Sequence, residues 1–319
     1  MASLAIETHG LTKTYGRTTA LNDLDLRVPA GSIVGFLGPN GSGKSTTIKL
    51  LLGLARPTAG GGTVLGHDIV GHGPAVRSLV GYLAQKPAFD PTMTAREVVR
   101  FSASFDRTLS GTALEDRVQE SLAAVGLGGK EDQRARTMSG GELQRVGIAQ
   151  ASVTRPPLLI LDEPASALDP VGRAEVLETI RALRGTSTVF FSTHILDDVQ
   201  NTSDHVIILK RGQLAAEGPI QQLLSGGGGG PRYEATLLGG SDELRDSLGR
   251  EPWVRSVTAS TRDGLTRWTV EVSDAEVAAE RLVRFLVADP GVRLIEYGPE
   301  RRELEDVFLD LVRKETPTP

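Results

Sequence analysis

One glycine-rich segment constrains the fold of this chain more than any other part of the sequence. It reads Gly38-Pro39-Asn40-Gly41-Ser42-Gly43-Lys44-Ser45. The apolar run Ile33–Leu37 precedes it and is expected to be a strand, and Lys44–Gly53 follows with the apolar spacing of a helix. Glycines let backbone N–H groups turn inward around phosphate oxygens, because no Cβ stands in the way. The N-terminus of the following helix adds a partial positive charge. The segment therefore predicts a phosphate-binding loop between a buried strand and a helix.

The end of this loop supplies the charge and the hydroxyl that a nucleotide needs. Lys44 offers a cation to the β- and γ-phosphates, and the Ser45 hydroxyl can ligate Mg²⁺. A chance match to the whole pattern is expected only about 0.01 times in such a chain, and the strand–loop–helix context makes it rarer. Alone, the loop fits an NTPase or a kinase. The loop residues assigned to ATP binding are Gly38, Pro39, Asn40, Gly41, Ser42, Gly43, Lys44, Ser45 and Thr46.

A second predicted strand ends in two carboxylates. The apolar run Leu158–Leu161 is typical of a strand buried in a parallel sheet, and Asp162-Glu163-Pro164 follows it. Such a strand would bring Asp162 to the sheet edge beside the phosphate loop, where it could hold Mg²⁺ directly or through water. Glu163 could activate a water against the γ-phosphate. The alternative is a strand that ends in a solvated acidic turn, which loses weight beside a phosphate-binding loop.

A Ser-Gly-Gly segment lies between these two motifs. Met138-Ser139-Gly140-Gly141-Glu142 stands just before a predicted helix, Glu142–Thr154. A hydroxyl and exposed N–H groups at a helix start form a second anion-binding device, although in isolation they would be only an N-cap followed by glycines. In this position the segment resembles the signature sequence of ATP-binding cassette (ABC) ATPases. It departs from the family consensus at Met138 and Glu142, where Leu and Gln are usual, and keeps the Ser-Gly-Gly core.

The remaining landmarks of the ABC family follow in the correct order. The resemblance implies that Tyr15 stacks on adenine and that Gln85 begins the loop that senses magnesium and the transport partner. It also implies that Ala167-Leu168-Asp169 crosses a dimer interface and that His194 contacts the γ-phosphate. Each residue alone fits an ordinary surface aromatic, a loop amide or a capped strand end. Together they extend the resemblance over residues 4–225.

The resemblance implies an α/β P-loop NTPase domain with a helical insertion, which binds ATP and Mg²⁺ and hydrolyses ATP as a head-to-tail homodimer. The presence of Glu163 and His194 argues against a nucleotide-binding regulator without turnover. By function, the implied residues are catalytic Glu163, His194 and Lys44; the magnesium ligands Ser45, Gln85 and Asp162; and, on the ATP of the opposite chain, Ser139, Gly140, Gly141 and Asp169.

Composition narrows the setting of this function. The 319 residues are 39% hydrophobic and 24% charged, which suits a packed globular chain. The absence of cysteine removes disulfides, thiolate metal sites and cysteine nucleophiles. With 35 Lys and Arg against 40 Asp and Glu, a broad nucleic-acid-binding surface is not expected. No apolar stretch approaches the roughly 20 residues of a spanning helix. Together with this, the resemblance to ABC ATPases implies a peripheral protein at the cytoplasmic face of the membrane, attached through a separate membrane subunit.

Five consecutive glycines divide the sequence. Gly226–Gly230 and Pro231 form a predicted flexible linker, 226–231, between an ATP-binding domain, 1–225, and a small accessory domain, 232–319. Before the linker we expect strands at Leu4–Glu7, Leu24–Val28 and Val189–Ser192, and helices at Ala95–Asp106 and Leu114–Val125. After the linker the expected order is βαββαβα, which resembles a small ferredoxin-like α+β domain. Those elements are Tyr233–Leu238, Asp242–Leu248, Val254–Ala259, Arg267–Val272, Ala275–Val287, Val292–Tyr297 and Arg301–Val312.

The last predicted helix carries two signals. One is an apolar stripe at Leu304, Val307, Phe308, Leu311 and Val312. Such a stripe usually packs on its own domain. The other is the segment Glu303–Leu309, which resembles the ending of ATPase subunits of ABC-2-type drug and antibiotic exporters and implies an ABC-2-type membrane permease as partner. The rival function is a soluble ABC-type ATPase that acts on nucleic acid or ribosomes. Such proteins generally carry two cassettes or a long coiled-coil insertion, and this chain has neither.

Overall fold

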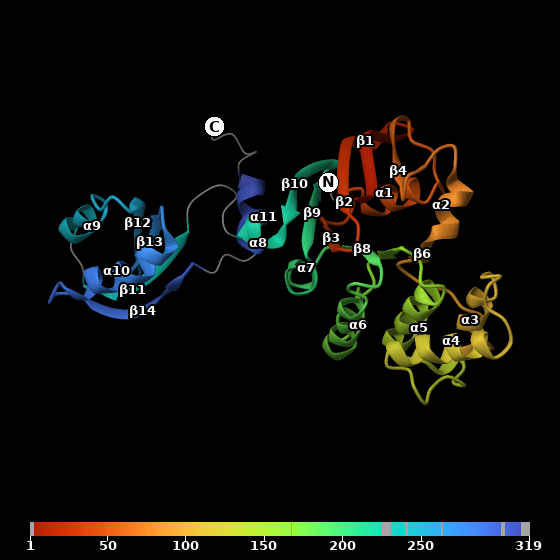
Figure 1. Cartoon of the computed structure of the whole chain (residues 1–319). Coiled ribbons are helices and arrows are strands. Elements are labelled where there is room, and N and C mark those ends of the chain that lie inside the picture. The colour runs from red at the N-terminus through yellow and green to blue at the C-terminus, as the bar shows by residue number, and fades with distance from the viewer. Residues whose placement is uncertain are drawn as a thin grey trace. The chain divides into compact units, whose positions relative to one another are not determined.

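A computed structural model (Figure 1) describes residues 3–166, 168–224, 231–239, 242–262, 264–300 and 304–313, without the side chains of residues 262 and 309–313. The chain divides into two compact units, residues 1–220 and 221–319. This division falls shortly before residue 225, where the sequence predicts the end of the first domain. The predicted glycine run, Gly226–Gly230, lies outside the described residues, and so does Ala167.

A six-stranded sheet forms the centre of the first unit. In sheet order its strands are β10 (Gln213–Pro219), β9 (His205–Lys210), β3 (Ile33–Leu37), β8 (Thr188–Thr193), β7 (Leu158–Asp162) and β6 (Val80–Leu83). All adjacent pairs are parallel except the edge pair of β10 and β9. Every residue of β3, β7 and β8 is buried, which explains their apolar sequences. The carboxyl ends of the parallel strands lie at one edge of the sheet. Gly38, Glu163 and His194 directly follow β3, β7 and β8, so they lie at this same edge.

The second sheet of this unit is antiparallel. In order, its strands are β2 (Thr18–Pro29), β1 (Leu4–Tyr15), β4 (Ala59–Val64) and β5 (His67–Asp68). Strands β1 and β2 form a long hairpin that extends well beyond the predicted strands Leu4–Glu7 and Leu24–Val28. Helix α1 (Lys44–Leu51) places Ile48 and Leu51 in one buried cluster with residues of both sheets. This packing sets the start of α1 against the central sheet.

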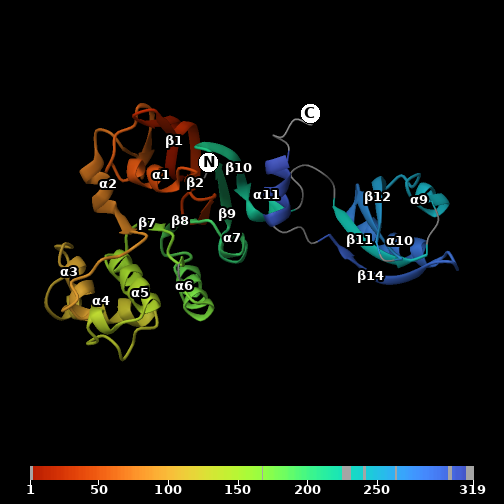
Figure 2. The same cartoon turned by 180° about the vertical axis from the view of Figure 1, so that it is seen from behind.

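Three helices form the insertion that the sequence predicts. They are α3 (Ala95–Ala103), α4 (Gly111–Ala124) and α5 (Gly140–Ser152), and they lie together in the two opposite views of Figure 1 and Figure 2. Helix α3 begins with a capping box, in which Thr94 and Glu97 each satisfy the backbone N–H of the other. The other elements before residue 225 are α2 (Gly73–Leu79), the 3₁₀ turn Ala135–Thr137, α6 (Pro170–Ala182), α7 (Leu196–Thr202) and α8 (Ile220–Leu224).

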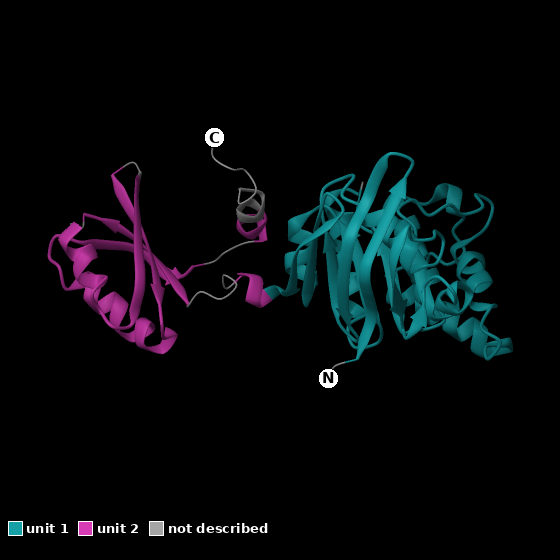
Figure 3. Ribbon diagram, turned by 90° about the horizontal axis from the view of Figure 1, so that it is seen from above, with its two compact units in different colours: residues 1–220 teal, residues 221–319 magenta. Residues whose placement is uncertain are grey.

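The second unit, drawn in its own colour in Figure 3, has a four-stranded antiparallel sheet. Its elements are β11 (Arg232–Leu238), α9 (Asp242–Leu248), β12 (Val254–Arg262), β13 (Leu265–Val272), α10 (Ala275–Val287), β14 (Arg293–Pro299) and α11 (Leu304–Arg313). The strand order is β12-β13-β11-β14. Both tryptophans of the chain, Trp253 and Trp268, lie in the buried cluster of this unit. In α11, Leu304 and Val307 are buried, while the side chains of residues 311 and 312 lie outside the described part. Among the described residues, none of the helices combines the length and apolar character that a bilayer crossing requires.

Candidate active site

The loop between β3 and α1 has a backbone that depends on its glycines. Gly41 and Gly43 have φ of +80° and +112°, a region that other residues rarely adopt. A Cβ on Gly38 would stand 2.4 Å from the carbonyl oxygen of Leu209, so the loop passes too close to β9 for a side chain there. The Gly38 N–H donates to the carbonyl oxygen of Thr193 at 3.2 Å. The loop is therefore held against the carboxyl ends of the parallel strands.

This loop borders a cavity of about 360 Å³. Lys44 is only 5% exposed, and its Nζ donates to the carbonyl oxygens of Gly38 at 2.7 Å and Pro39 at 3.3 Å. The Oγ of Ser42 is buried without a hydrogen-bond partner among the described residues, but Ser42 does not line the cavity. The cavity is lined by Ala20, Asn40, Gly41, Gly43, Lys44, Ser45, Thr46, Gln85 and Glu163. A buried cation and a helix N-terminus together suit a phosphate group.

Ala20 also lines the cavity, although no motif in the sequence indicates it. It belongs to β2, and its carbonyl oxygen would be only 2.7 Å from a Cβ on Gly43. The approach of the β1–β2 hairpin to the loop therefore requires glycine at position 43. A small apolar residue in a strand carries no chemical signal, so only the tertiary packing reveals its place in the site.

The predicted catalytic residues meet at Glu163. Its side chain is 9% exposed, and Oε1 lies 3.5 Å from the Nζ of Lys44. Its Oε2 accepts a hydrogen bond from the Nε2 of Gln85 at 3.0 Å and lies 3.6 Å from the Nδ1 of His194. The four residues come from the start of α1, the segment after β6, and the ends of β7 and β8. This geometry suits a carboxylate that accepts a proton beside a bound γ-phosphate.

A serine that the sequence analysis did not assign to the site holds both acidic residues. The Oγ of Ser192 donates to Oδ1 of Asp162 at 2.6 Å and accepts from the backbone N–H of Glu163 at 2.9 Å. Glu163 has a φ of +48°, which is uncommon outside glycine, so this hydroxyl supports an unusual turn. Burial raises the pKa of nearby Tyr82, and the charge of Asp162 raises it further. The signal for Ser192 is a hydroxyl that closes the apolar run Val189–Phe191.

The predicted magnesium ligands are oxygen donors on three elements. Ser45 lies in the first turn of α1. Ser45 and Gln85 both line the cavity. Asp162 ends β7 and is 5% exposed, and its carboxylate accepts the hydrogen bond from the Oγ of Ser192. Mg²⁺ takes hydroxyl and carboxylate oxygens, usually one or two carboxylates together with substrate phosphates. Within the described part of the chain, no three acidic, histidine or cysteine side chains form a metal cage. The donor set therefore fits a cation that arrives with a nucleotide.

The Ser-Gly-Gly segment does not line this cavity in its own chain. Ser139 is the N-cap of α5: its Oγ accepts from the N–H of Glu142 at 3.2 Å, and its N–H donates to Glu142 Oε2 at 2.8 Å. The Nζ of Lys130 donates to Oε1 of Glu142 at 2.6 Å, and this contact, with the bond from Ser139, lowers the pKa of Glu142. Within a single chain, the Ser-Gly-Gly segment therefore acts as the N-cap of α5. The contact of Ser139–Gly141 with the ATP of a second chain stays a prediction.

Asp169 and Tyr15 do not line the cavity either, and the same holds for Gly38, Pro39, Ser42, Asp162 and His194. Asp169 is the exposed N-cap of α6, which begins close to α5: the Cα of Gly172 is 3.7 Å from the position of a Cβ on Gly141. Tyr15 ends β1 and is 48% exposed. The Nζ of Lys13 lies 4.8 Å from the centroid of its ring. The roles of Asp169 at a dimer interface and of Tyr15 on adenine stay predictions.

Comparison with known proteins places this site in context. A family model described as ABC transporter matches residues 21–166. The chain is similar to the uncharacterized ABC transporter ATP-binding protein YxlF of Bacillus subtilis, with 35% identity over 97% of this chain and 99% of that protein. It is also similar to the daunorubicin resistance ATP-binding protein DrrA3 of Streptomyces coeruleorubidus, with 34% identity over 98% of this chain and 96% of that protein. Among solved structures it resembles a dimeric post-hydrolysis ATP-binding cassette bound to ADP and Pi, with 27% identity, a TM-score of 0.61, and 67% of this chain and 98% of that chain covered.

Proposed function

Because this chain belongs to the family of ABC transporter ATP-binding proteins, we propose that it is the energy-supplying subunit of an exporter of the drug or antibiotic type. It binds ATP and hydrolyses it, as the family does. The similarity to a daunorubicin resistance protein extends over nearly the whole of both chains and supports the export role. The convergence of Lys44, Gln85 and His194 on Glu163 carries the assignment of the active site.

The ATP phosphates would bind in the cavity at the N-terminus of α1, with the β- and γ-phosphates at Lys44. Mg²⁺ held by Ser45, Gln85 and Asp162 would neutralise phosphate charge during the reaction. Backbone N–H groups of the glycine loop would turn toward the phosphate oxygens, as the positive φ values of Gly41 and Gly43 favour. These contacts bind and orient the nucleotide without moving a proton.

Glu163 would then act as the general base. In the structure, its carboxylate shares the Lys44 ammonium with backbone carbonyls. A γ-phosphate carries more charge than a carboxylate and would draw Lys44 away, which frees Glu163 to take a proton from the attacking water. The water oxygen bonds to the γ-phosphorus while the bond to the β-phosphate oxygen breaks, and ADP leaves. His194, already 3.6 Å from Glu163, would contact the γ-phosphate.

A second copy of the chain would complete the site. Ser139–Gly141 and Asp169 do not line the cavity of their own chain, so they are available to the ATP held by a partner. Two chains would close head to tail over two ATP molecules. The dimeric state of the similar solved cassette supports this arrangement. Closure and reopening would drive a separate ABC-2-type membrane permease, to which the chain attaches at the cytoplasmic face.

Copurification and resistance assays test the exporter role against the rival ATPase of nucleic acid or ribosomes. The tagged chain is expected to bring down a polytopic membrane protein from native cells. Expressed with that membrane protein in a drug-sensitive host, the chain should raise resistance to an anthracycline or another antibiotic. Glu163→Gln with the same membrane protein is the matched control and should give no resistance. Capture of ribosomes or nucleic acid, with no membrane protein, would favour the rival function.

A further inference from the structure

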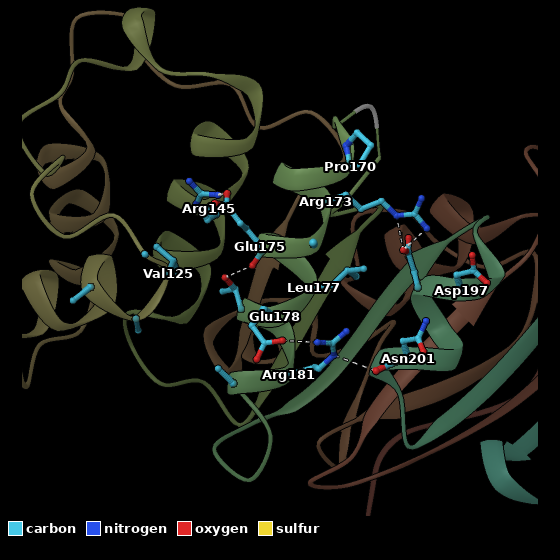
Figure 4. A pocket seen from close by; sticks show the side chains of 17 residues that line it. Val125, Arg145, Pro170, Arg173, Glu175, Leu177, Glu178, Arg181, Asp197 and Asn201 are labelled. Carbon is cyan, nitrogen blue, oxygen red and sulfur yellow. Dashed lines mark hydrogen bonds and ion pairs between the residues drawn. The ribbon is translucent and has the colours of Figure 1, made fainter.

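Ion pairs hold helix α6 on both of its sides, and Figure 4 labels Arg145, Glu175 and Arg173, three of the four residues involved. Toward α5, Arg145 pairs with Glu175, and toward α7, Arg173 pairs with Asp198. A groove of about 870 Å³ is lined by α6 together with residues of α4, α5 and α7. The two pairs differ in burial, because the side chain of Glu175 is 52% exposed and that of Asp198 only 2%. Loss of the pair toward α7 would therefore leave a buried carboxylate, whereas loss of the pair toward α5 would leave a half-exposed one.

Asp198 is a buried carboxylate held by a two-pronged contact. Its Oδ1 accepts from Nε of Arg173 at 2.7 Å and lies 2.6 Å from Nη2 of the same guanidinium. Burial raises the pKa of Asp198, and the contact with Arg173 acts in the opposite direction. Removing a carboxylate from water is costly even when it is paired, so such a pair contributes little net stability compared with apolar packing. Because net stability does not account for this pair, its fixed geometry needs a functional explanation.

The other oxygen of Asp198 reaches the segment that carries His194. Oδ2 accepts from Oγ1 of Thr193 at 3.2 Å, and this hydroxyl in turn accepts from the N–H of Ile195 at 3.1 Å. The carbonyl oxygen of Thr193 accepts from Gly38 of the phosphate loop at 3.2 Å. The backbone is therefore fixed on both sides of His194, although the His194 side chain itself is 40% exposed.

The same helix begins at the predicted interface segment. Asp169 is the N-cap of α6, and the N–H of Arg173 donates to the carbonyl oxygen of Asp169 at 2.9 Å. This is the first hydrogen bond of the helix, so Asp169 and Arg173 belong to one rigid turn. A shift of this turn would carry Arg173 with it, and through Arg173 it would act on Asp198.

We propose that Arg173 is a positioning residue for ATP hydrolysis, which holds His194 in place through Asp198 and Thr193 and links it to the interface turn at Asp169. The inference rests on the proposed function, in which His194 contacts the γ-phosphate. Arg173 does not line the nucleotide cavity, so it acts through these protein contacts alone. Its loss should affect the chemical step and spare the capture of ATP.

ATPase kinetics of Arg173→Gln test the proposal, with Arg181→Gln as the matched control. Arg181 lies on the same helix and also reaches α7, where its Nε donates to the carbonyl oxygen of Asn201 at 3.1 Å. Arg173→Gln is expected to lower kcat by about 10- to 100-fold, the range for a misplaced catalytic group, while equilibrium binding of a labelled ATP analogue stays near the wild-type value. Arg181→Gln should keep the wild-type kcat. Equal losses in both variants, or a parallel loss of ATP binding, would overturn the proposal.

A His194→Ala background separates positioning from a general structural role. If Arg173 acts through His194, Arg173→Gln should lower kcat no further once His194 is absent. Effects of the two substitutions that simply multiply would show that Arg173 acts elsewhere, and the proposal would fall.

Hydrogen exchange of the Ile195 amide gives a readout that needs no turnover. Its bond to Thr193 depends on the Asp198 contact, so Arg173→Gln should speed its exchange and Arg181→Gln should not. Where Arg173→Gln leaves too little folded protein, Asp198→Asn replaces it, because this change leaves no buried carboxylate without a cation and Arg173 is 29% exposed. Unchanged exchange in either folded variant contradicts the proposal. If instead exchange speeds up while His194→Ala keeps full ATPase activity, the positional link stands and the assigned role of His194 fails.

Discussion

Glu163 lies among three polar partners, and Lys44 is one of them. Glu163 lines the cavity and has a positive φ. A bound γ-phosphate and this carboxylate would compete for the same ammonium group. Substitution at this position should therefore change both the chemical step and the fate of bound ATP.

Glu163→Gln is expected to lower turnover by roughly 10² to 10⁴, the usual contribution of a general base. ATP should still bind, because Lys44, Ser45 and Asp162 remain. With no route to reopening, ATP should convert monomers of 33.9 kDa into a stable dimer of about twice that mass. Phosphate release gives the rate, and size-exclusion chromatography with light scattering, with and without ATP, gives the mass.

Asp162→Asn is the contrasting variant for this experiment. It weakens the magnesium site, so it should lower productive nucleotide binding as well as turnover. An isolated Glu163→Gln protein that hydrolyses ATP at the parental rate would exclude Glu163 as the base.

Ser139→Arg is expected to abolish ATPase activity and to leave ATP binding near normal, because the proposed role of Ser139 is at the nucleotide of the opposite chain. Loss of the cap itself should cost only about 1 kcal/mol. Thr94→Arg is the matched control, since Thr94 makes the same capping box at the start of α3, and it should keep ATPase activity. Equilibrium binding of a labelled ATP analogue decides the question. A loss of affinity beyond about tenfold in Ser139→Arg would contradict the assignment to the opposite chain's site.

At the scale of elements, continuous apolar runs with a sharp boundary could be predicted well. Strand β3 has the predicted bounds, and β7 continues the predicted run by one residue to Asp162. Strand β6 was missed because it is short, contains Gly81 and has partly exposed residues. Its existence depends on pairing with β7, which no local pattern shows. The predicted helical insertion is present: α3 begins at the predicted Ala95 and ends before the predicted Asp106, and α4 and α5 begin and end one to three residues earlier than predicted.

The same distinction applies to the site. Lys44 and Glu163 could be predicted because each belongs to a motif with its own chemistry, whereas Gln85 and His194 were expected only from the resemblance to the ABC family. The structure brings the four residues together. The roles of Arg173, Ser192 and Asp198 could not be predicted, because each depends on a contact with a residue distant in the sequence. In the sequence, a serine or an arginine of a predicted strand or helix gives no sign of whether such a partner exists.

Gly81→Ala tests how closely α5 packs on the edge of the central sheet. A Cβ at this position would stand 2.0 Å from the carbonyl oxygen of Ala151 and 2.6 Å from a methyl group of Leu159. Forced overpacking of this kind should lower the free energy of unfolding by about 3 kcal/mol. Gly61→Ala in β4 is the control, since a Cβ there meets nothing within 4 Å, and it should change stability by less than about 1 kcal/mol. Urea unfolding followed by circular dichroism compares the two variants, and equal stabilities would show that α5 can move away without cost.

At the scale of the whole molecule, a chain that ends at Ser225 should fold and bind ATP, while assembly with the membrane subunit or transport falls. The residues of the candidate cavity all lie in the first unit, and the second unit has a buried cluster of its own. Binding of a labelled ATP analogue and complementation of transport measure the two outcomes. Insoluble truncated protein, or soluble protein that binds no ATP, would mean that the two units need each other to fold.

The placement of the two tryptophans gives this chain an intrinsic spectroscopic label for one unit. Trp253 and Trp268 are buried in the second unit, and residues 1–220 contain no tryptophan. Tryptophan emission therefore reports melting beyond residue 220, whereas circular dichroism reports melting of the entire chain. ATP at a hundred times its dissociation constant stabilises the unit that binds it by about 2.7 kcal/mol, so it should raise the melting temperature seen by circular dichroism and leave the fluorescence transition in place. A fluorescence transition that moves with ATP would reveal, without any added dye, that nucleotide binding is transmitted into the accessory domain.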